Sequence, residues 1–281
     1  MAKLFYKGLL SQHMAFSLLE AVFLAIVQGM TEWIPVSSSG HLAIAEMALG
    51  IQPPLIFNLA VHLGTLAAVI LVFAEDVKSI LKATPRMFSF LFRGRLPDRQ
   101  DADARMALYL FLATLPAAIF GFLAKGLAEE LFFSPTALSG FFILTGFVLL
   151  STRRMKPRHL ESVHSSMVVG IAQIIAIFPG VSRSGITISA GLHSGLQRDE
   201  AAHFSFLLSI PLIIGSTVFQ ALSVSTPSGL YPHLALGMLV AFVVGFFSIR
   251  FLKRIVHEGK LHDFAPYCLL VGVGLIIWGI M

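Results

Sequence analysis

The stretch AQIIAIFPGVSRSG, residues 172–185, places an arginine between two serines inside an otherwise apolar region. An earlier stretch, VQGMTEWIPVSSSG at residues 27–40, has a similar order of polar residues. An offset of 145 residues aligns Gln28 with Gln173, two serine pairs and the final glycines, and leaves the prolines one position apart. Gly and Ser are common in membrane helices, so chance similarity is the alternative. The matched order indicates an internal repeat.

The composition indicates a membrane protein built from helices. Hydrophobic residues make up 56% of the chain and charged residues 12%, against about 25% charged in ordinary soluble domains. The apolar runs are continuous, which excludes the short alternating segments of a membrane barrel. The net charge of +5 is assigned to basic loops at the membrane, so no nucleic-acid partner is expected. The single cysteine, Cys268, cannot form an internal disulfide.

Eight apolar regions are predicted, six of which are near the ~20 residues needed to cross a bilayer. Two regions, 15–50 and 165–197, are instead interrupted by Pro and Gly. A break at membrane depth is tolerated where the backbone is buried in protein or lines a wet cavity. Both regions are therefore predicted to be re-entrant helix–loop–helix hairpins, with second halves near 41–49 and 186–196. The six predicted spans are 54–74, 106–126, 135–152, 203–222, 231–250 and 265–281.

The distribution of Lys and Arg predicts the topology. Most basic residues lie in the connections 75–105, 153–162 and 250–263, which share one face only if the interrupted regions do not cross. That face is predicted to be cytosolic and both termini outside, with Lys3 and Lys7 as exceptions. The connection 75–105 is expected to be a polar loop, partly amphipathic at 77–92.

Three spans follow each interrupted region, so the second copy is inverted in the membrane. We therefore expect an all-α membrane domain of two inverted-topology repeats, residues 1–152 and 153–281. Inverted repeats whose broken helices meet near the midplane recur in transporters.

The interrupted regions predict a site for an anion. Each Ser–Gly stretch precedes a half-helix, whose free N–H groups and dipole favour negative charge. Arg183 adds a planar cation suited to phosphate oxygens, and an anionic substrate would offset its insertion cost of at least ~2.5–3.5 kcal/mol. The alternatives are that Arg183 pairs with a buried carboxylate such as Glu32, or that it reaches the interface.

The first interrupted region adds residues suited to hydrolysis. Gln28 and Glu32 are four residues apart and share a helix face; three serines follow, and then His41. A serine could act as nucleophile, with His41 or Glu32 carrying the proton. Glu32 and Gln28 could also hold a divalent cation that bridges phosphates. The alternatives are helix capping by the serines and simple packing by His41. His62 and His193 are expected to be interior hydrogen-bond partners.

These motifs resemble those of the bacterial undecaprenyl-diphosphate phosphatases, a family linked to bacitracin resistance. The likeness covers nearly the whole chain and is strongest at 28–41, at PGVSRSG with Thr187, and at HFSFLLSIP, residues 203–211. The resemblance implies hydrolysis of undecaprenyl diphosphate to undecaprenyl phosphate and inorganic phosphate, which recycles the lipid carrier of peptidoglycan synthesis. It also implies a periplasmic opening and a divalent cation, Mg²⁺ or Ca²⁺. The family allows Glu or Gln at position 28, and Gln28 brings no charge to a metal.

The resemblance and the chemistry together define the predicted site. The catalytic residues are expected to be Glu32, Ser37 or Ser38, His41 and Arg183, with Glu32 also as metal ligand. The residues expected to bind substrate or phosphate are Gln28, Ser39, Gly40, Gly180, Ser182, Ser184, Gly185 and Thr187.

Two functions remain open at this point. The first is a phosphatase of polyprenyl diphosphates in the bacterial inner membrane. The second is a transporter or flippase of a phosphorylated lipid or anion that performs no hydrolysis. The expected partners are the lipid substrate and the bilayer, and a homodimer is left open.

Overall fold

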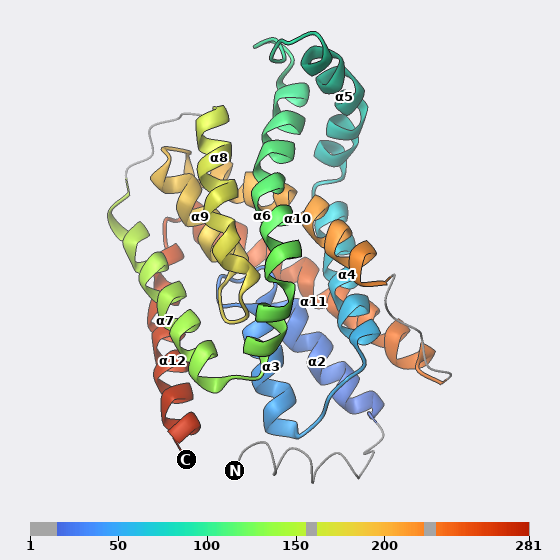
Figure 1. Cartoon of the computed structure of the whole chain (residues 1–281), viewed down its shortest axis with the longest axis vertical. Helices are drawn as coiled ribbons and strands as arrows, with labels where there is room; N and C mark the ends of the chain where they lie inside the picture. Colours follow the sequence, from blue (N-terminus) through green and yellow to red (C-terminus); the bar gives the residue numbers. More distant parts are fainter. Residues whose placement is uncertain (1–15, 156–161, 222–228, 281) are drawn as a thin grey trace.

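The protein is almost entirely helical. The computed structural model describes residues 16–155, 162–221 and 229–280, and omits the side chains of Lys125 and Glu129 (Figure 1). Of the described residues, 84% are helical and none lies in a strand, which confirms the predicted all-α class. The α-helices are α2 (Leu18–Thr31), α3 (Ser38–Leu49), α4 (Leu55–Val72), α5 (Ala74–Phe92), α6 (Ala102–Phe132), α7 (Pro135–Ser151), α8 (Val163–Ala172), α9 (Arg183–His193), α10 (Arg198–Ala221), α11 (Tyr231–His257) and α12 (Ala265–Ile280), with short 3-10 turns η1 (Thr152–Arg154), η2 (Gln173–Ile177) and η3 (Leu261–Phe264).

The two interrupted regions form pairs of short helices. Helices α2 and α3 have 14 and 12 residues, and α8 and α9 have 10 and 11, so none reaches the ~20 residues needed to cross. The first pair occupies the lower half of the molecule and the second the upper half (Figure 1). The predicted helix–break–helix units are thus confirmed. Their opposite placement is consistent with inverted repeats, and the division at residue 152 stays a prediction.

Six longer helices correspond to the predicted spans. By length and apolar composition they are able to cross a membrane: α4, the first 23 residues of α6, α7 with η1, α10, α11, and α12 with η3. The largest difference is in α6, which was predicted as 106–126 and extends from Ala102 to Phe132. This makes the chain a multi-pass membrane protein.

The connection 75–105 was predicted to be a loop, and this was wrong for most of its length. Residues 74–92 form helix α5, because Ala83 and Met87 make an apolar stripe that is buried against Ala104 and Leu108 of α6. The amphipathic pattern noted at 77–92 therefore reflects packing within the chain on one face.

An ion pair joins α5 to the start of α6 near the turn between them. Arg86 donates through Nε to Asp101 Oδ2 at 2.9 Å, and this bond lowers the pKa of the Asp101 carboxyl. Asp101 also caps α6 by accepting from the Ala104 N–H. The two contacts fix the point at which the chain turns from α5 back into the membrane.

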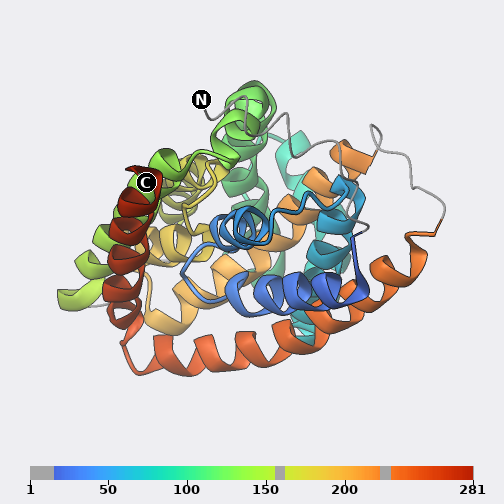
Figure 2. The same cartoon turned by 90° about the horizontal axis from the view of Figure 1, so that it is seen from below.

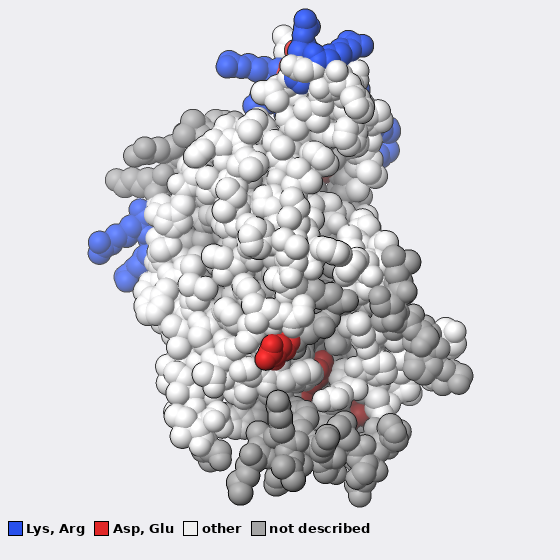
Figure 3. Space-filling view, in the orientation of Figure 1, with Lys and Arg blue, Asp and Glu red and all other residues white. Residues whose placement is uncertain are grey.

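Basic side chains gather at one end of the molecule. Lys and Arg cover its upper end, around α5 and the start of α6 (Figure 3). The end of α11 lies beside the start of α10, where His257 Nδ1 is 2.9 Å from Asp199 Oδ2. This agrees with basic connections sharing one face. Lys3, Lys7, Lys156 and Arg158 lie outside the described residues.

Helix α11 packs along α2 and α4 at one side of the molecule, and α12 packs against α7 at another (Figure 2). Small residues permit this close approach. At Gly64 of α4, an added Cβ would overlap the carbonyl oxygen of Met238 in α11. At Gly29 of α2, an added Cβ would lie 2.8 Å from Val244 Cβ. The contact at Gly29 holds the first hairpin against α11, and the contact at Gly64 holds α4 against the same helix.

Gly64→Ala is expected to destabilise the protein by about 1–3 kcal/mol, because the methyl group would push α11 away from α4. Thermal unfolding of the purified protein in detergent measures this change. Gly215→Ala in α10 is the matched control, because no atom lies within 4 Å of the added Cβ. Equal unfolding temperatures for the two variants would contradict the packing assigned to Gly64.

Candidate functional site

The two breaks in the hairpins meet inside the molecule. We call residues 32–37 the first break loop and residues 178–182 the second. A Cβ on Gly40 would lie 3.0 Å from Gly180 Cα and 2.6 Å from Phe142, and a Cβ on Gly185 would lie 3.3 Å from Pro35. Gly180 also has φ +95°, a conformation that favours glycine. Glycine is therefore needed where the two loops touch.

The serines at the matched positions cap both second half-helices. Ser37 Oγ accepts from the Gly40 N–H at 3.2 Å, and Ser182 Oγ accepts from the Gly185 N–H at 3.1 Å. Helix capping, the alternative role considered for the serines, is therefore confirmed for Ser37 and Ser182. The half-helices begin at Ser38 and Arg183, three residues before the predicted starts. The motifs themselves therefore form the first turns, where backbone N–H groups lack partners within the helix.

Two further serines accompany these caps. Ser39 Oγ lies 3.4 Å from Ser37 Oγ, and Ser184 Oγ lies 3.3 Å from Ser182 Oγ. Ser37 also has φ 71°, which is uncommon for a residue other than glycine and typical of strained functional segments. The same hydrogen-bond pattern 145 residues apart agrees with the predicted repeat.

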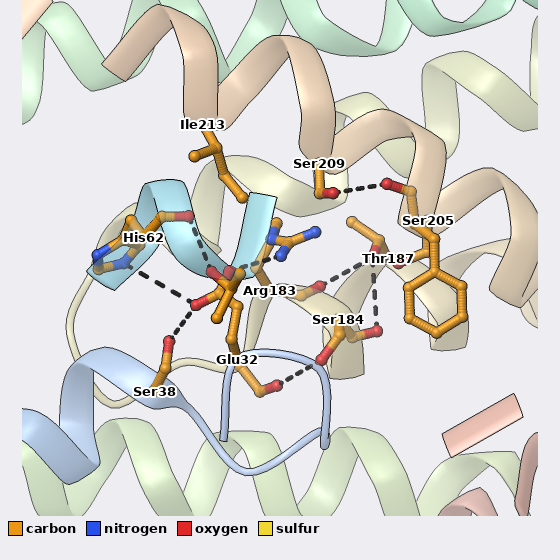
Figure 4. Close-up of polar contacts among 12 residues, drawn as sticks. Glu32, Ser38, His62, Arg183, Ser184, Thr187, Ser205, Ser209 and Ile213 are labelled. Atoms are coloured by element: carbon orange, nitrogen blue, oxygen red, sulfur yellow. Dashed lines mark hydrogen bonds and ion pairs between the residues drawn. The ribbon is translucent and has the colours of Figure 1, made fainter. Parts of the chain in front are cut away.

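A buried ion pair connects the two hairpins at this point. Arg183 Nη2 donates to Glu32 Oε1 at 2.8 Å, and the side chains are 17% and 6% exposed (Figure 4). Glu32 Oε2 accepts from Ser38 Oγ at 2.6 Å and from Gln28 Nε2 at 2.9 Å. The structure thus brings together four predicted site residues. It also realises the alternative in which Arg183 pairs with Glu32.

The ion pair leaves part of Arg183 unused. Its Nη1 is buried and has no hydrogen-bond partner among the residues that the structure describes, and its guanidinium lies 5.5 Å from the centre of the Trp33 ring. A buried donor without a partner costs roughly 1–3 kcal/mol or more when it is charged. An oxygen of a bound anion would satisfy this donor. Pairing with Glu32 and binding of an anion are therefore compatible, because they use different edges of the guanidinium.

His62, which the sequence analysis expected only as an interior hydrogen-bond partner, lies near Glu32. It lies on α4, where Nδ1 is 2.7 Å from the carbonyl oxygen of Asn58, so Nδ1 carries the proton. Its Nε2 lies 3.9 Å from Glu32 Oε2, and the side chain is 31% exposed. The expectation of an interior hydrogen bond is confirmed, but the contact with Glu32 was missed. Only the fold brings α4 beside the first break loop.

His41 occupies a different position from the one expected for a proton carrier beside Glu32. Its Nδ1 is 2.8 Å from the Ser37 carbonyl oxygen, and its Nε2 is 2.7 Å from the Tyr267 hydroxyl. The ring also stacks on Tyr267 with centroids 5.7 Å apart. Both ring nitrogens are thus engaged in contacts that hold the first turn of α3 against α12.

Helix α10 supports the first turn of α9 through hydroxyl groups. Thr187 Oγ1 donates to the Arg183 carbonyl oxygen at 2.8 Å and lies 2.6 Å from Ser205 Oγ (Figure 4). Ser205 belongs to the stretch HFSFLLSIP. Thr187 therefore acts on the backbone that carries Arg183, and this stretch of α10 fixes its position.

The described residues do not form a ready metal centre. Among them, no group of three or more His, Cys, Asp and Glu side chains is placed to hold an ion. Glu32 is the carboxylate of the site, and both its oxygens already accept hydrogen bonds. A divalent cation would need substrate phosphates and water for most of its ligands, as Mg²⁺ commonly does. The predicted cation stays a prediction.

The chain as a whole is similar to proteins of one family. The family described as "Bacitracin resistance protein BacA" matches residues 21–274. A protein of Korarchaeum cryptofilum named "Undecaprenyl-diphosphatase" is 37% identical over 92% of this chain and 97% of its own. Proteins of the same name from Desulforapulum autotrophicum and Desulfosudis oleivorans are 38% and 39% identical, over 93% and 92% of this chain and 98% and 97% of theirs. The similarity includes both break loops.

Removing one partner of the buried ion pair is expected to cost more than removing both. Glu32→Ala would leave Arg183 buried without its carboxylate, at about 3–5 kcal/mol. The double variant with Arg183→Ala should recover a large part of that loss, as measured by unfolding in detergent. The exposed pair Arg254–Glu258 serves as the control cycle and should show little coupling. Additive losses at Glu32 and Arg183 would show that the pair does not join the hairpins.

Proposed function

The chain belongs to the Bacitracin resistance protein BacA family, and on this premise we propose that it hydrolyses undecaprenyl diphosphate to undecaprenyl phosphate and inorganic phosphate. The resemblance drawn from the sequence motifs is confirmed, and relatives that share most of its length are named undecaprenyl-diphosphatase. The observation that carries the proposal is the buried, unpartnered Nη1 of Arg183 beside Glu32 and Ser38. It supports a buried site that accepts an anion and holds a hydroxyl next to a carboxylate.

We propose that the terminal phosphate of the substrate binds between the two capped half-helices. Its oxygens would accept from Arg183 Nη1 and from the free N–H groups in the first turns of α3 and α9, with both helix dipoles favouring its charge. Ser182, Ser184 and Gly185 shape the turn on one side, and Ser39 and Gly40 shape it on the other. The same donors would stabilise the charge that spreads over the phosphoryl oxygens in the transition state.

Of the two candidate serines, we assign the reacting position to Ser38. Residue Ser37 is only 2% exposed, and its Oγ caps α3. Ser38 Oγ instead donates to Glu32 Oε2. Glu32 is placed to take the proton as Ser38 Oγ, or a water that it holds, attacks the terminal phosphorus. The bond from that phosphorus to the bridging oxygen breaks, and undecaprenyl phosphate leaves. Attack by water gives inorganic phosphate directly, whereas attack by Ser38 gives a phosphoserine ester that water then hydrolyses, which releases inorganic phosphate and restores the hydroxyl.

His62 and the cation complete the proposal. His62 Nε2 lies 3.9 Å from the carboxylate oxygen that accepts from Ser38, and a shorter contact during the reaction would let it exchange a proton with Glu32. Glu32 and Gln28 would hold a divalent cation, Mg²⁺ or Ca²⁺, that neutralises phosphate charge. His41 is a positioning residue in this scheme, because it orders the first turn of α3.

We also propose where the enzyme works. The basic end of the molecule would face the cytosol, with both termini outside, and the site would open to the periplasmic side of the bacterial inner membrane. The substrate would reach it from the bilayer, since moving its chain into water costs about 0.8 kcal/mol per CH₂. A homodimer remains part of the proposal. A transporter would use the anion site but would leave the Ser38–Glu32 contact without a role.

Purified wild-type protein is expected to release phosphate from undecaprenyl diphosphate, and Arg183→Ala should lower the rate by about 10²–10³. Arg183→Lys should recover only part of it, because an ammonium lacks the two-edged fork. EDTA should suppress release if the cation takes part. The transporter would be supported instead if folded wild-type protein released no phosphate from several polyprenyl diphosphates. In that case it should move a polyprenyl diphosphate across the membrane of liposomes.

Ser38→Ala should abolish most activity, while Ser39→Ala, which removes only a 3.4 Å hydroxyl contact, should retain most of it.

His62→Ala is expected to lower kcat by about 10²-fold as the loss of a proton carrier. His41→Ala should instead lower the unfolding temperature, with a smaller direct effect on kcat. A His62→Ala enzyme with normal kcat would remove this residue from the mechanism.

A further inference from the structure

A second concave site lies between α4 and α11, apart from the break loops. It is a groove of about 240 Å³ lined by Leu71, Phe242, Val243, Phe246 and Phe247. Phe242 and Phe246 form its floor, because both pack against the main hydrophobic core. Leu71, Val243 and Phe247 form its rim and are 54%, 44% and 63% exposed. All five side chains are apolar, so the groove suits a hydrocarbon chain.

Two exposed cations stand beside this groove. The Arg250 guanidinium lies 4.2 Å from the centre of the Phe246 ring, and Lys253 Nζ lies 5.0 Å from the centre of the Phe73 ring. Phe73 is the residue at which α4 ends and the chain turns into α5. The cations are therefore at the level where the chain leaves the membrane, one turn apart on the same helix face.

These cations lack the acidic partners that their neighbours have. Arg254 and Lys260 are bound to Glu258 at 3.0 and 2.7 Å. Among the described residues, Arg250 and Lys253 form no ion pair with Asp or Glu and contact aromatic rings instead. Two uncompensated cations at the end of an apolar groove match a ligand with one hydrocarbon chain and one anionic head.

We propose that this groove binds an anionic phospholipid of the leaflet at the basic end of the molecule. One acyl chain would lie along Phe242 and Phe246, and the phosphate would contact Arg250 and Lys253. The planar fork of Arg250, held over the ring of Phe246, presents donors suited to phosphate oxygens. The groove covers residues 242–247 of α11, about 8 Å along the helix, which suits part of an acyl chain better than a long polyprenyl tail.

Native mass spectrometry of the delipidated full chain tests this site, with phosphatidylglycerol and phosphatidylcholine of identical acyl chains as probes. The wild type should bind phosphatidylglycerol preferentially. Arg250→Ala and Lys253→Ala should each weaken that binding roughly fivefold and weaken phosphatidylcholine binding less, because the choline cation of that lipid offsets the charge of its phosphate. Val243→Trp, which would fill the groove, should weaken binding of both lipids. Arg254→Ala is the matched control, because it removes a cation of the same helix that already has a carboxylate partner.

Equal binding of the two lipids by the wild type would overturn the proposal. So would an Arg254→Ala loss as large as those of Arg250→Ala and Lys253→Ala, since general surface charge would then explain the preference. Undecaprenyl phosphate that displaces phosphatidylglycerol at equal concentration, with the same dependence on Arg250, would overturn the assignment to a phospholipid. Unfolding temperatures of the variants close to that of the wild type would show that the losses come from the site.

Discussion

The structure depends on one ion pair, Arg183 with Glu32, that joins two hairpins entering from opposite ends of the molecule. Each half of a hairpin is too short to cross a bilayer, so neither half is held in place by the membrane alone. The pair is 83% and 94% buried by side chain, and removing one partner from such a pair strands the other. The contact therefore fixes the register of the break loops, and the serine caps then set the direction of the half-helices.

Breaking a helix inside a membrane exposes backbone groups that lipid cannot satisfy. This chain covers part of that cost with its own side chains. Ser37 and Ser182 each accept one N–H, Thr145 accepts the Ser182 N–H at 3.2 Å, and Cys268 Sγ lies 3.7 Å from the Pro35 carbonyl oxygen. The first turns of α3 and α9 begin beside the place where the two break loops touch, at Gly40 with Gly180 and at Gly185 with Pro35. The same feature that makes the fold costly thus leaves unpaired N–H groups where the anion site is proposed.

Local sequence was sufficient for features that depend on composition and short spacing. Apolar runs of about 20 residues predicted the six long helices, and Pro and Gly clusters predicted the breaks. Two kinds of feature could not be predicted in this way. Helix α5 is stabilised by burial of Ala83 and Met87 against α6, and this partner is not visible in its own sequence. The sequence places His41 after three serines and a glycine and His62 in an apolar run, but only tertiary packing directs His62 to Glu32 and His41 to Tyr267.

The charge balance of the site gives a physical reason to expect a cation. Arg183 and Glu32 neutralise each other before substrate binds, and this leaves one edge of the guanidinium for the phosphate. A diphosphate brings at least two further negative charges into a buried region, where repulsion from Glu32 is screened weakly. Arg183 supplies one positive charge, yet it already acts on Glu32. The divalent cation proposed above would offset this excess, although Gln28 contributes no charge of its own.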